Sequence, residues 1–210
     1  NYDMRRARDV ADNLGVAWTH VPSELKNLKQ LYCSNTRKEY TDYAWGAHMV
    51  SVWLDFEALT CLIRDKKIQD NAIIINGYSG DFLFGGHIPQ NLVDQPTITN
   101  LVDLITQKHC AHFKSDVLHQ SSEKIKNQIR REYNLLFHDD SAIDNLCSFY
   151  EYWDWQERQV KAVVNGQRLY EHFRFEWLLP FWDKALLDFW VKIPLSLRLN
   201  QNLHTKLQLV

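Results

Sequence analysis

The sequence predicts an α/β fold whose second half is largely helical. Three observations predict it: an amphipathic helical pattern near the start, a β-branched apolar run directly before a glycine-rich loop, and amphipathic patterns from about residue 100 onward. We expect residues 1–99 to form the α/β part and residues 100–210 the helical part of a single domain.

The first part alternates helices and strands. Residues 3–14 carry apolar side chains at helical spacing, and Gly15 is a natural stop. Residues 16–21 predict a short strand, and residues 53–66 predict another helix. The run Ala72-Ile73-Ile74-Ile75 predicts a strand buried on both faces, as in a parallel sheet.

The second part reads as a series of helices. Residues 100–112 and 115–136 are amphipathic. Ser141 to Asp144 resembles a capping box, and the helix that it opens is expected to end near Gly166. Asp183 is placed to cap a helix that Pro194 stops.

The composition excludes several classes of protein. A net charge of −2 excludes a strongly basic nucleic-acid binder, and no apolar run approaches the roughly 20 residues that a membrane helix needs. Four widely spaced cysteines without a CxxC predict reduced thiols and a cytoplasmic protein. The chain starts at Asn1 without a methionine and stops without a tail, which predicts a piece of a longer protein.

The segment with the clearest chemistry is the loop from Asn76 to Gly86. It follows the predicted buried strand, at the end where α/β sheets bind ligands. Gly77 and Gly80 allow backbone N–H groups to approach an anion, and Asp81 is a hard oxygen donor that suits Mg²⁺. The pattern alone fits a phosphate and magnesium site or a plain glycine turn with a solvated aspartate.

Three segments resemble motifs of the asparagine synthase family. The loop resembles its S-G-E-G-S-D-E-L-F-G-G signature, with matches at Gly77, Asp81, Leu83, Phe84, Gly85 and Gly86. Residues 176–183 resemble E-x-R-x-P-F-L-D and keep the glutamate and P-F-x-D. Residues 203–207 resemble a late segment in which a lysine, here Lys206, precedes K-x-x-L-R. The motifs occur in family order and span nearly the whole chain.

The resemblance implies a fold, a reaction and a set of site residues. The fold would be a truncated HUP-like adenine-nucleotide alpha hydrolase, or ATP-pyrophosphatase, fold. The enzyme would use ATP and Mg²⁺ to adenylate a small-molecule carboxylate, and ammonia, from glutamine through a glutaminase domain upstream, or another amine would then form the amide. Lysines and Mg²⁺ would neutralise the leaving pyrophosphate.

Roles carry over only at matching positions. Asp81 would bind the metal, and Lys206 would stabilise the intermediate. Asn76, Gly77, Ser79 and Gly80 would contact the nucleotide.

Three departures from the family pattern qualify this assignment. The first signature, S-G-G-x-D-S, is absent and is expected upstream of Asn1, so the fragment alone is expected to be inactive. The loop glutamate is Tyr78, as in the β-lactam synthetase branch. A tyrosine, with an ordinary pKa near 10, needs a partner to act as a base, and Glu151 and Glu157 are candidates. Leu178 replaces the family arginine, so we expect substrate recognition to differ from that of a true asparagine synthetase. Gly80-Asp81-Phe82 and Tyr170-Glu171 resemble the divergent members linked to polysaccharide biosynthesis.

Other readings remain open. A non-catalytic remnant that binds a nucleotide or a partner would also explain the lost glutamate and arginine. Two roles are open for Tyr78, a base or a packing residue, and two for His87, a phosphate contact or the commoner structural role. The histidines around Cys110 lack the spacing of a zinc site, and the aromatic residues 150–155 fit core packing better than a pocket wall.

Overall fold

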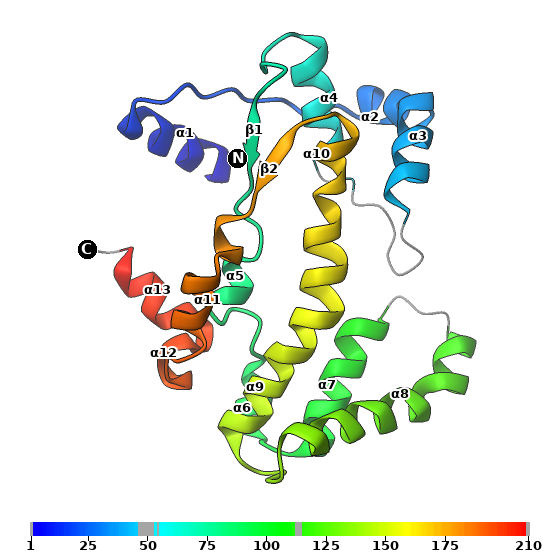
Figure 1. The fold of residues 1–210 in the computed structure, drawn as a ribbon, viewed down its shortest axis with the longest axis vertical. Helices are drawn as coiled ribbons and strands as arrows, with labels where there is room; N and C mark the ends of the chain where they lie inside the picture. The colour runs from blue at the N-terminus through cyan, green and yellow to red at the C-terminus, as the bar shows by residue number, and fades with distance from the viewer. Residues whose placement is uncertain (1, 46–52, 54, 112–114, 209–210) are drawn as a thin grey trace. The chain divides into compact units, whose positions relative to one another are not determined.

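The chain is mostly helical and contains one small sheet. The computed structural model describes residues 2–45, 53, 55–111 and 115–208. Helices make up 68% of it, and two strands, β1 (Ile73–Ile75) and β2 (Glu176–Leu178), pair in parallel (Figure 1). The largely helical second half is confirmed. The sheet is smaller than an α/β fold leads one to expect, and the HUP-like fold stays a prediction.

The described helices follow one another in three groups. Before β1 lie α1 (Tyr2–Leu14), α2 (Leu25–Tyr32), α3 (Asn35–Ala44) and α4 (Phe56–Arg64). Between the strands lie α5 (Gly80–Leu83), α6 (Gln90–Asp94), α7 (Ile98–Cys110), α8 (Ser115–Leu136), α9 (Ile143–Asp154), a π-helix (Trp155–Val164) and α10 (Arg168–His172). After β2 come a 3₁₀ helix (Pro180–Trp182), α11 (Lys184–Trp190), α12 (Leu195–Arg198), a second 3₁₀ helix (Leu199–Gln201) and α13 (Asn202–Leu207). Of the described helices, none has the length and apolar character needed to cross a membrane.

Two compact units share these elements. The first comprises residues 1–73 and 168–176, and the second comprises residues 74–167 and 177–210. The predicted division at residue 99 does not coincide with this one. The predicted loop and both later motifs, apart from Glu176, belong to the second unit.

In the first unit, α1 ends as the sequence predicts but no strand follows it. The N–H of Gly15 bonds to the carbonyl of Asp12, and the N–H of Val16 bonds to that of Ala11, which is the Schellman pattern. The strand predicted at residues 16–21 is wrong, because residues 16–24 have no regular structure. Strand propensity expresses itself through packing against a neighbouring strand, and no described strand pairs with this segment.

The core of the first unit is aromatic. Tyr40 is fully buried and packs against the rings of Trp53 and Phe56. Phe56 and Leu59 are buried along α4, which confirms the helix predicted over residues 53–66. The hydroxyl of Tyr170 also donates a 2.7 Å hydrogen bond to Asp55 Oδ2 in this unit.

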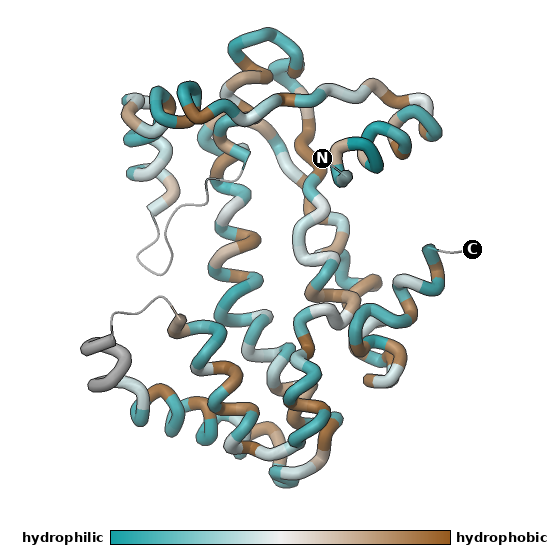
Figure 2. Tube along the Cα trace, turned by 180° about the vertical axis from the view of Figure 1, so that it is seen from behind, coloured by the Kyte–Doolittle hydropathy of each residue, from teal (hydrophilic) through white to brown (hydrophobic). Residues whose placement is uncertain are grey.

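The main core of the second unit lies among α6, α7, α8 and α9. Leu92, Leu101, Ile129 and Leu146, one from each helix, have no exposed surface. Apolar and polar residues alternate along these helices as amphipathic packing requires (Figure 2). The helices predicted over residues 100–112 and 115–136 are confirmed by α7 and α8, with residues 112–114 outside the described residues.

Of two helix caps predicted in this unit, the one at α11 is confirmed and the one at α9 is wrong. The carboxylate of Asp183 accepts a 3.1 Å hydrogen bond from the N–H of Leu186 and caps α11, as predicted. The capping box at Ser141 is wrong, because Asp139 Oδ1 accepts from Ser141 N and Ala142 N instead. α9 then begins at Ile143.

The strand before the loop is less buried than predicted. β1 is present, but Ile73 is 51% exposed and Ile75 is 68% exposed. The prediction of a strand buried on both faces is therefore wrong. A continuous β-branched run shows that a strand is favoured, but burial also requires helices to cover both faces of the sheet.

Candidate functional site

The loop that follows β1 is fixed first by its own backbone. The N–H of Asn76 bonds to the carbonyl of Leu178 at 3.0 Å, which continues the strand pairing by one residue. The side-chain oxygen of Asn76 accepts a 2.8 Å bond from the N–H of Tyr78, an Asx turn. Ser79 then adopts a left-handed conformation, with φ of 69°, and the short helix α5 begins. Asn76 therefore shapes the turn.

Two glycines of the loop allow close packing. A Cβ on Gly80 would lie 3.0 Å from Cε2 of Phe181, so this face of the glycine is covered by an aromatic ring. Gly85 has φ of +84°, and a Cβ there would lie 2.5 Å from the carbonyl oxygen of Arg198. A larger residue is excluded at Gly85 by the Arg198 backbone, whereas at Gly80 it would require the Phe181 ring to shift.

The hydroxyl of Ser79 is held by two side chains, one of them fully buried. It donates a 2.7 Å hydrogen bond to Gln159 Oε1, on the π-helix. It accepts a 3.0 Å bond from the indole Nε1 of Trp182, in the second motif. The single hydroxyl proton is thereby used within the protein, and the Ser79 side chain ties the loop to two other segments.

Asp81 is the most accessible ionisable group of the loop. Its side chain is 61% exposed, and one oxygen accepts a 2.9 Å bond from the N–H of Phe82. The other oxygen lies 2.9 Å from Nε2 of His87. Burial opposes ionisation, but the hydrogen bond and charge of His87 outweigh it and lower the pKa of the Asp81 carboxyl.

His87 joins this carboxylate to a second, fully buried one. Its Nδ1 lies 2.7 Å from Asp154 Oδ2, and its side chain is only 12% exposed. An imidazolium can donate to both carboxylates, whereas a neutral ring can donate to only one. The sequence left open whether His87 contacts a phosphate or has a structural role. In the structure, His87 bridges Asp81 and Asp154.

Asp154 is surrounded by groups from three segments. Lys108 Nζ, on α7, lies 2.9 Å from Oδ1, and Nε2 of His109 lies 3.6 Å from the same oxygen. Gln159 Nε2 lies 3.4 Å from Oδ2. Burial opposes ionisation of Asp154, but the hydrogen bonds and charges of His87 and Lys108 outweigh it and lower the pKa of its carboxyl. His87 thus links Asp81 to Asp154, and Lys108 and His109 approach Asp154 from α7.

The segments that carry the three motifs meet around this loop. Leu83 and Phe84 of the loop form an apolar cluster with Trp190, against which Phe181 and Leu203 pack. The ring of Phe84 also stacks on that of His204, with centroids 3.9 Å apart and planes 10° apart. The second motif contacts the loop through Phe181 and Trp182, and the third does so through Leu203 and His204.

Other predicted residues have separate positions. Lys206 lies on α13 and is exposed, and no ion pair among the described residues includes it. Glu151 pairs with Arg198, and Glu157 pairs with Lys161, so both candidate partners of Tyr78 are engaged by cations. Tyr78 is half-buried and Gly77 is exposed.

Among the described residues, Asp81 has no partners that would make it part of a preformed multi-ligand metal centre. Within the part of the chain that the structure describes, no group of three His, Cys, Asp or Glu residues could hold a metal ion. A magnesium ion needs only one or two protein carboxylates when substrate phosphates and water supply the other oxygens. A single accessible carboxylate such as Asp81 fits that use and does not fit a zinc site.

Comparisons with known proteins add no further constraint. No family model, no curated protein and no solved structure matches this chain.

Three residues of the network escaped the sequence analysis: Lys108, Asp154 and Gln159. Asp154 had a visible signal, because it lies on the same helical stripe as Leu146 and Tyr150, where a polar residue must be satisfied. Gln159 follows Asp154 by five residues, which is the spacing of a π-helix. No sequence pattern distinguishes that spacing from an ordinary helix.

We expect Gly85→Ala to lower the free energy of unfolding by roughly 2–5 kcal/mol, because the methyl group meets the Arg198 carbonyl and the left-handed backbone disfavours alanine. Gly15→Ala is the matched control: φ is +66°, but the space is open, so roughly 1–2 kcal/mol is expected. Urea unfolding followed by circular dichroism measures both. Equal losses would show that the close approach at Gly85 has no energetic effect.

We expect Asp154→Asn to lower the free energy of unfolding at pH 7 by roughly 3–5 kcal/mol, because it leaves Lys108 and His87 without their buried counter-charge. The carboxyl pKa is lowered in the folded state, so this stabilisation is full above about pH 4 and is lost as the pH falls further. The difference between wild type and variant should therefore stay constant from pH 7 to about pH 4 and shrink as the pH falls below 4 in urea titrations. The exposed pair of Asp103 with Lys126 supplies the control, Asp103→Asn, with a change of at most about 1 kcal/mol. A difference that does not vary with pH would refute the assignment.

Proposed function

We propose that the native protein is an ATP-dependent, amide-forming enzyme similar to the asparagine synthase family. It would adenylate a carboxylate and transfer ammonia or an amine to the activated acyl group. The observation that carries the proposal is that three segments, chosen from the sequence by their motifs alone, contact one another around one loop. Trp182 donates to Ser79 of that loop, and His204 stacks on Phe84.

The separation of these segments along the chain gives the observation its weight. Ser79 and Trp182 are 103 residues apart. Three chance matches would have no reason to meet in space, whereas motifs of one active site must do so. The contacts also lie within one compact unit.

Asp81 has the properties that a magnesium ligand in such a site needs. Its carboxylate is accessible and, like an ordinary aspartate, ionised at neutral pH; His87 lowers its pKa further and contacts one of its oxygens. Bound ATP and Mg²⁺ would supply the adenylyl group and neutralise charge on the departing pyrophosphate. The chain's own part is to hold Asp81 in place through His87 and Asp154.

Tyr78 is proposed at the acyl centre, as its place in the loop motif implies. It precedes Ser79, whose side chain is anchored, so the backbone on its C-terminal side is held. Asn76 holds the other side by accepting from the Tyr78 N–H. Gly77 and Gly80 are proposed to contact the nucleotide through backbone N–H groups, and Lys206 to stabilise the charged intermediate.

One observation favours a second candidate function, that of a non-catalytic nucleotide- or partner-binding remnant. Ser79 and one face of Gly80, two of the proposed nucleotide contacts, are occupied by Gln159, Trp182 and Phe181. ATP–pyrophosphate exchange by the polypeptide isolated from its source separates the two functions. Exchange that depends on an added carboxylate supports the enzyme. Nucleotide binding without exchange for any carboxylate supports the remnant.

We expect Asp81→Asn to abolish ATP–pyrophosphate exchange in the native polypeptide, because a neutral amide is a weak ligand for Mg²⁺. The control is again Asp103→Asn, an exposed carboxylate on α7, which should retain exchange. Near-wild-type thermal unfolding of the Asp81 variant must accompany the loss. Exchange that survives the substitution would remove Asp81 from the metal site.

We expect Tyr78→Phe to leave ATP–pyrophosphate exchange nearly intact but to slow amide formation by roughly 10²–10⁴-fold, the usual contribution of a general base. Phenylalanine keeps the ring and removes only the hydroxyl. Exchange and product formation are measured on the same preparation. A similar fall in both half-reactions would mean that Tyr78 positions the loop and does not act on the amine.

A further inference from the structure

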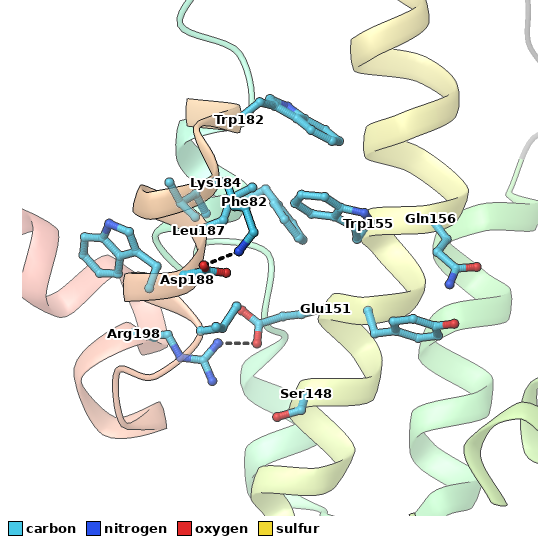
Figure 3. A pocket seen from close by; sticks show the side chains of 14 residues that line it. Phe82, Ser148, Glu151, Trp155, Gln156, Trp182, Lys184, Leu187, Asp188 and Arg198 are labelled. Carbon is cyan, nitrogen blue, oxygen red and sulfur yellow. Dashed lines mark hydrogen bonds and ion pairs between the residues drawn. The ribbon is translucent and has the colours of Figure 1, made fainter. Parts of the chain in front are cut away.

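The second unit contains a cavity that the proposed function does not use. Its volume is about 610 Å³, within the usual range for small-molecule sites. Phe82 and Leu83 of α5 line it, together with residues of α9, the π-helix, α11 and α12 (Figure 3). Asp81 and Tyr78 do not line it.

The walls of this cavity are aromatic and are fixed in place. Trp155 and Trp182 have ring centroids 4.3 Å apart, and Phe82 lies 6.0 Å from Trp155. The indole N–H of Trp182 is hydrogen-bonded to Ser79, which fixes the orientation of that ring. Figure 3 shows Trp155, Trp182 and Phe82 grouped along one part of the cavity. Rings held before binding lose little entropy when a ligand stacks on them.

The charges that line the cavity cancel. Arg198 pairs with Glu151, and its Nε donates a 2.8 Å bond to the carbonyl of Ile193, so the guanidinium is held on two sides. Both members of this pair are largely buried, with 10% and 15% of their side chains exposed. Lys184 pairs with Asp188 in a second, exposed pair. Figure 3 shows both pairs as dashed contacts.

This balance of charge selects against charged ligands. A phosphate or carboxylate would meet Glu151 and Asp188, and a cation would meet Arg198 and Lys184. A ligand with a formal charge finds no unpaired counter-charge here, and breaking the buried pair would leave an uncompensated charge. A neutral ring disturbs neither pair, and Gln156 and Ser148 offer it hydrogen-bonding groups.

We propose that this cavity binds a neutral, planar aromatic ligand of the size of an indole or larger, stacked against the Trp155 and Trp182 wall. The proposal does not depend on amide formation, because it assigns no role to Asp81, Tyr78 or Lys206, none of which lines the cavity. The ring lies on the indole faces, and its polar edge meets Gln156 or Ser148.

Indole is the probe for this site, with tryptamine and indole-3-acetate as its cationic and anionic counterparts. We expect indole to bind with a dissociation constant of roughly 0.1–1 mM, as suits so small a fragment. The two charged analogues should bind at least about fivefold more weakly, because each meets a like charge in the cavity. ATP should not displace indole.

Fluorine NMR of the native polypeptide labelled with 5-fluorotryptophan locates the bound probe. The chain has eight tryptophans, and the resonances of Trp155, Trp182 and Trp190 should shift most. Trp155→Leu should weaken indole binding by about tenfold or more, since stacking contributes beyond apolar area. The matched control is Trp18→Leu, which removes a tryptophan of the first unit and should leave binding unchanged.

A second variant tests the site without removing a packed ring. Val191 lines the cavity but is 68% exposed, so Val191→Trp should fold normally and fill part of the space. It should reduce indole binding at least about fivefold. Equal binding by indole and its charged analogues, displacement by ATP, shifts confined to other tryptophans, or no binding at millimolar indole would each overturn the proposal.

Discussion

The burial of one carboxylate, that of Asp154, is the constraint on which the arrangement of the second unit depends. A buried carboxylate that stays ionised requires cations and hydrogen-bond donors close by, and here they come from separate segments. His87 comes from the end of the loop, Lys108 from α7 and Gln159 from the π-helix. Satisfying Asp154 therefore forces the loop to lie against the helices, and it sets the orientation of Asp81 through His87.

Apolar packing supplies the complementary part of this arrangement. The cluster of Leu83, Phe84 and Trp190, with Phe181 and Leu203 against it, draws the loop and both later motifs together without specifying directions. Hydrogen bonds supply the directions, and Trp182 belongs to both systems: its indole N–H fixes Ser79 and its ring lines the aromatic cavity. The loop and the cavity thus share a structural support although they differ in chemistry.

The features that were predicted correctly from the sequence are those that depend on residues close together in the chain. Gly15 ended α1 and Asp183 capped α11, because both effects act within one helical turn. The predictions of a strand at residues 16–21 and of a buried β1 were wrong, because both features depend on partners distant in the chain. The motifs located the loop and its contacting segments. The network behind the loop was not predicted, because the role of Asp154 depends on Lys108 from α7 and His87 from the end of the loop, which are distant in the sequence.

The π-helix decides which residue contacts Asp154. In an α-helix, residues four apart lie on one face, so Arg158 would lie on the same face as Asp154. With the wider turn, it is Gln159 that faces both Asp154 and Ser79. The wider turn of the π-helix thus places a neutral amide, and not a guanidinium, beneath the loop.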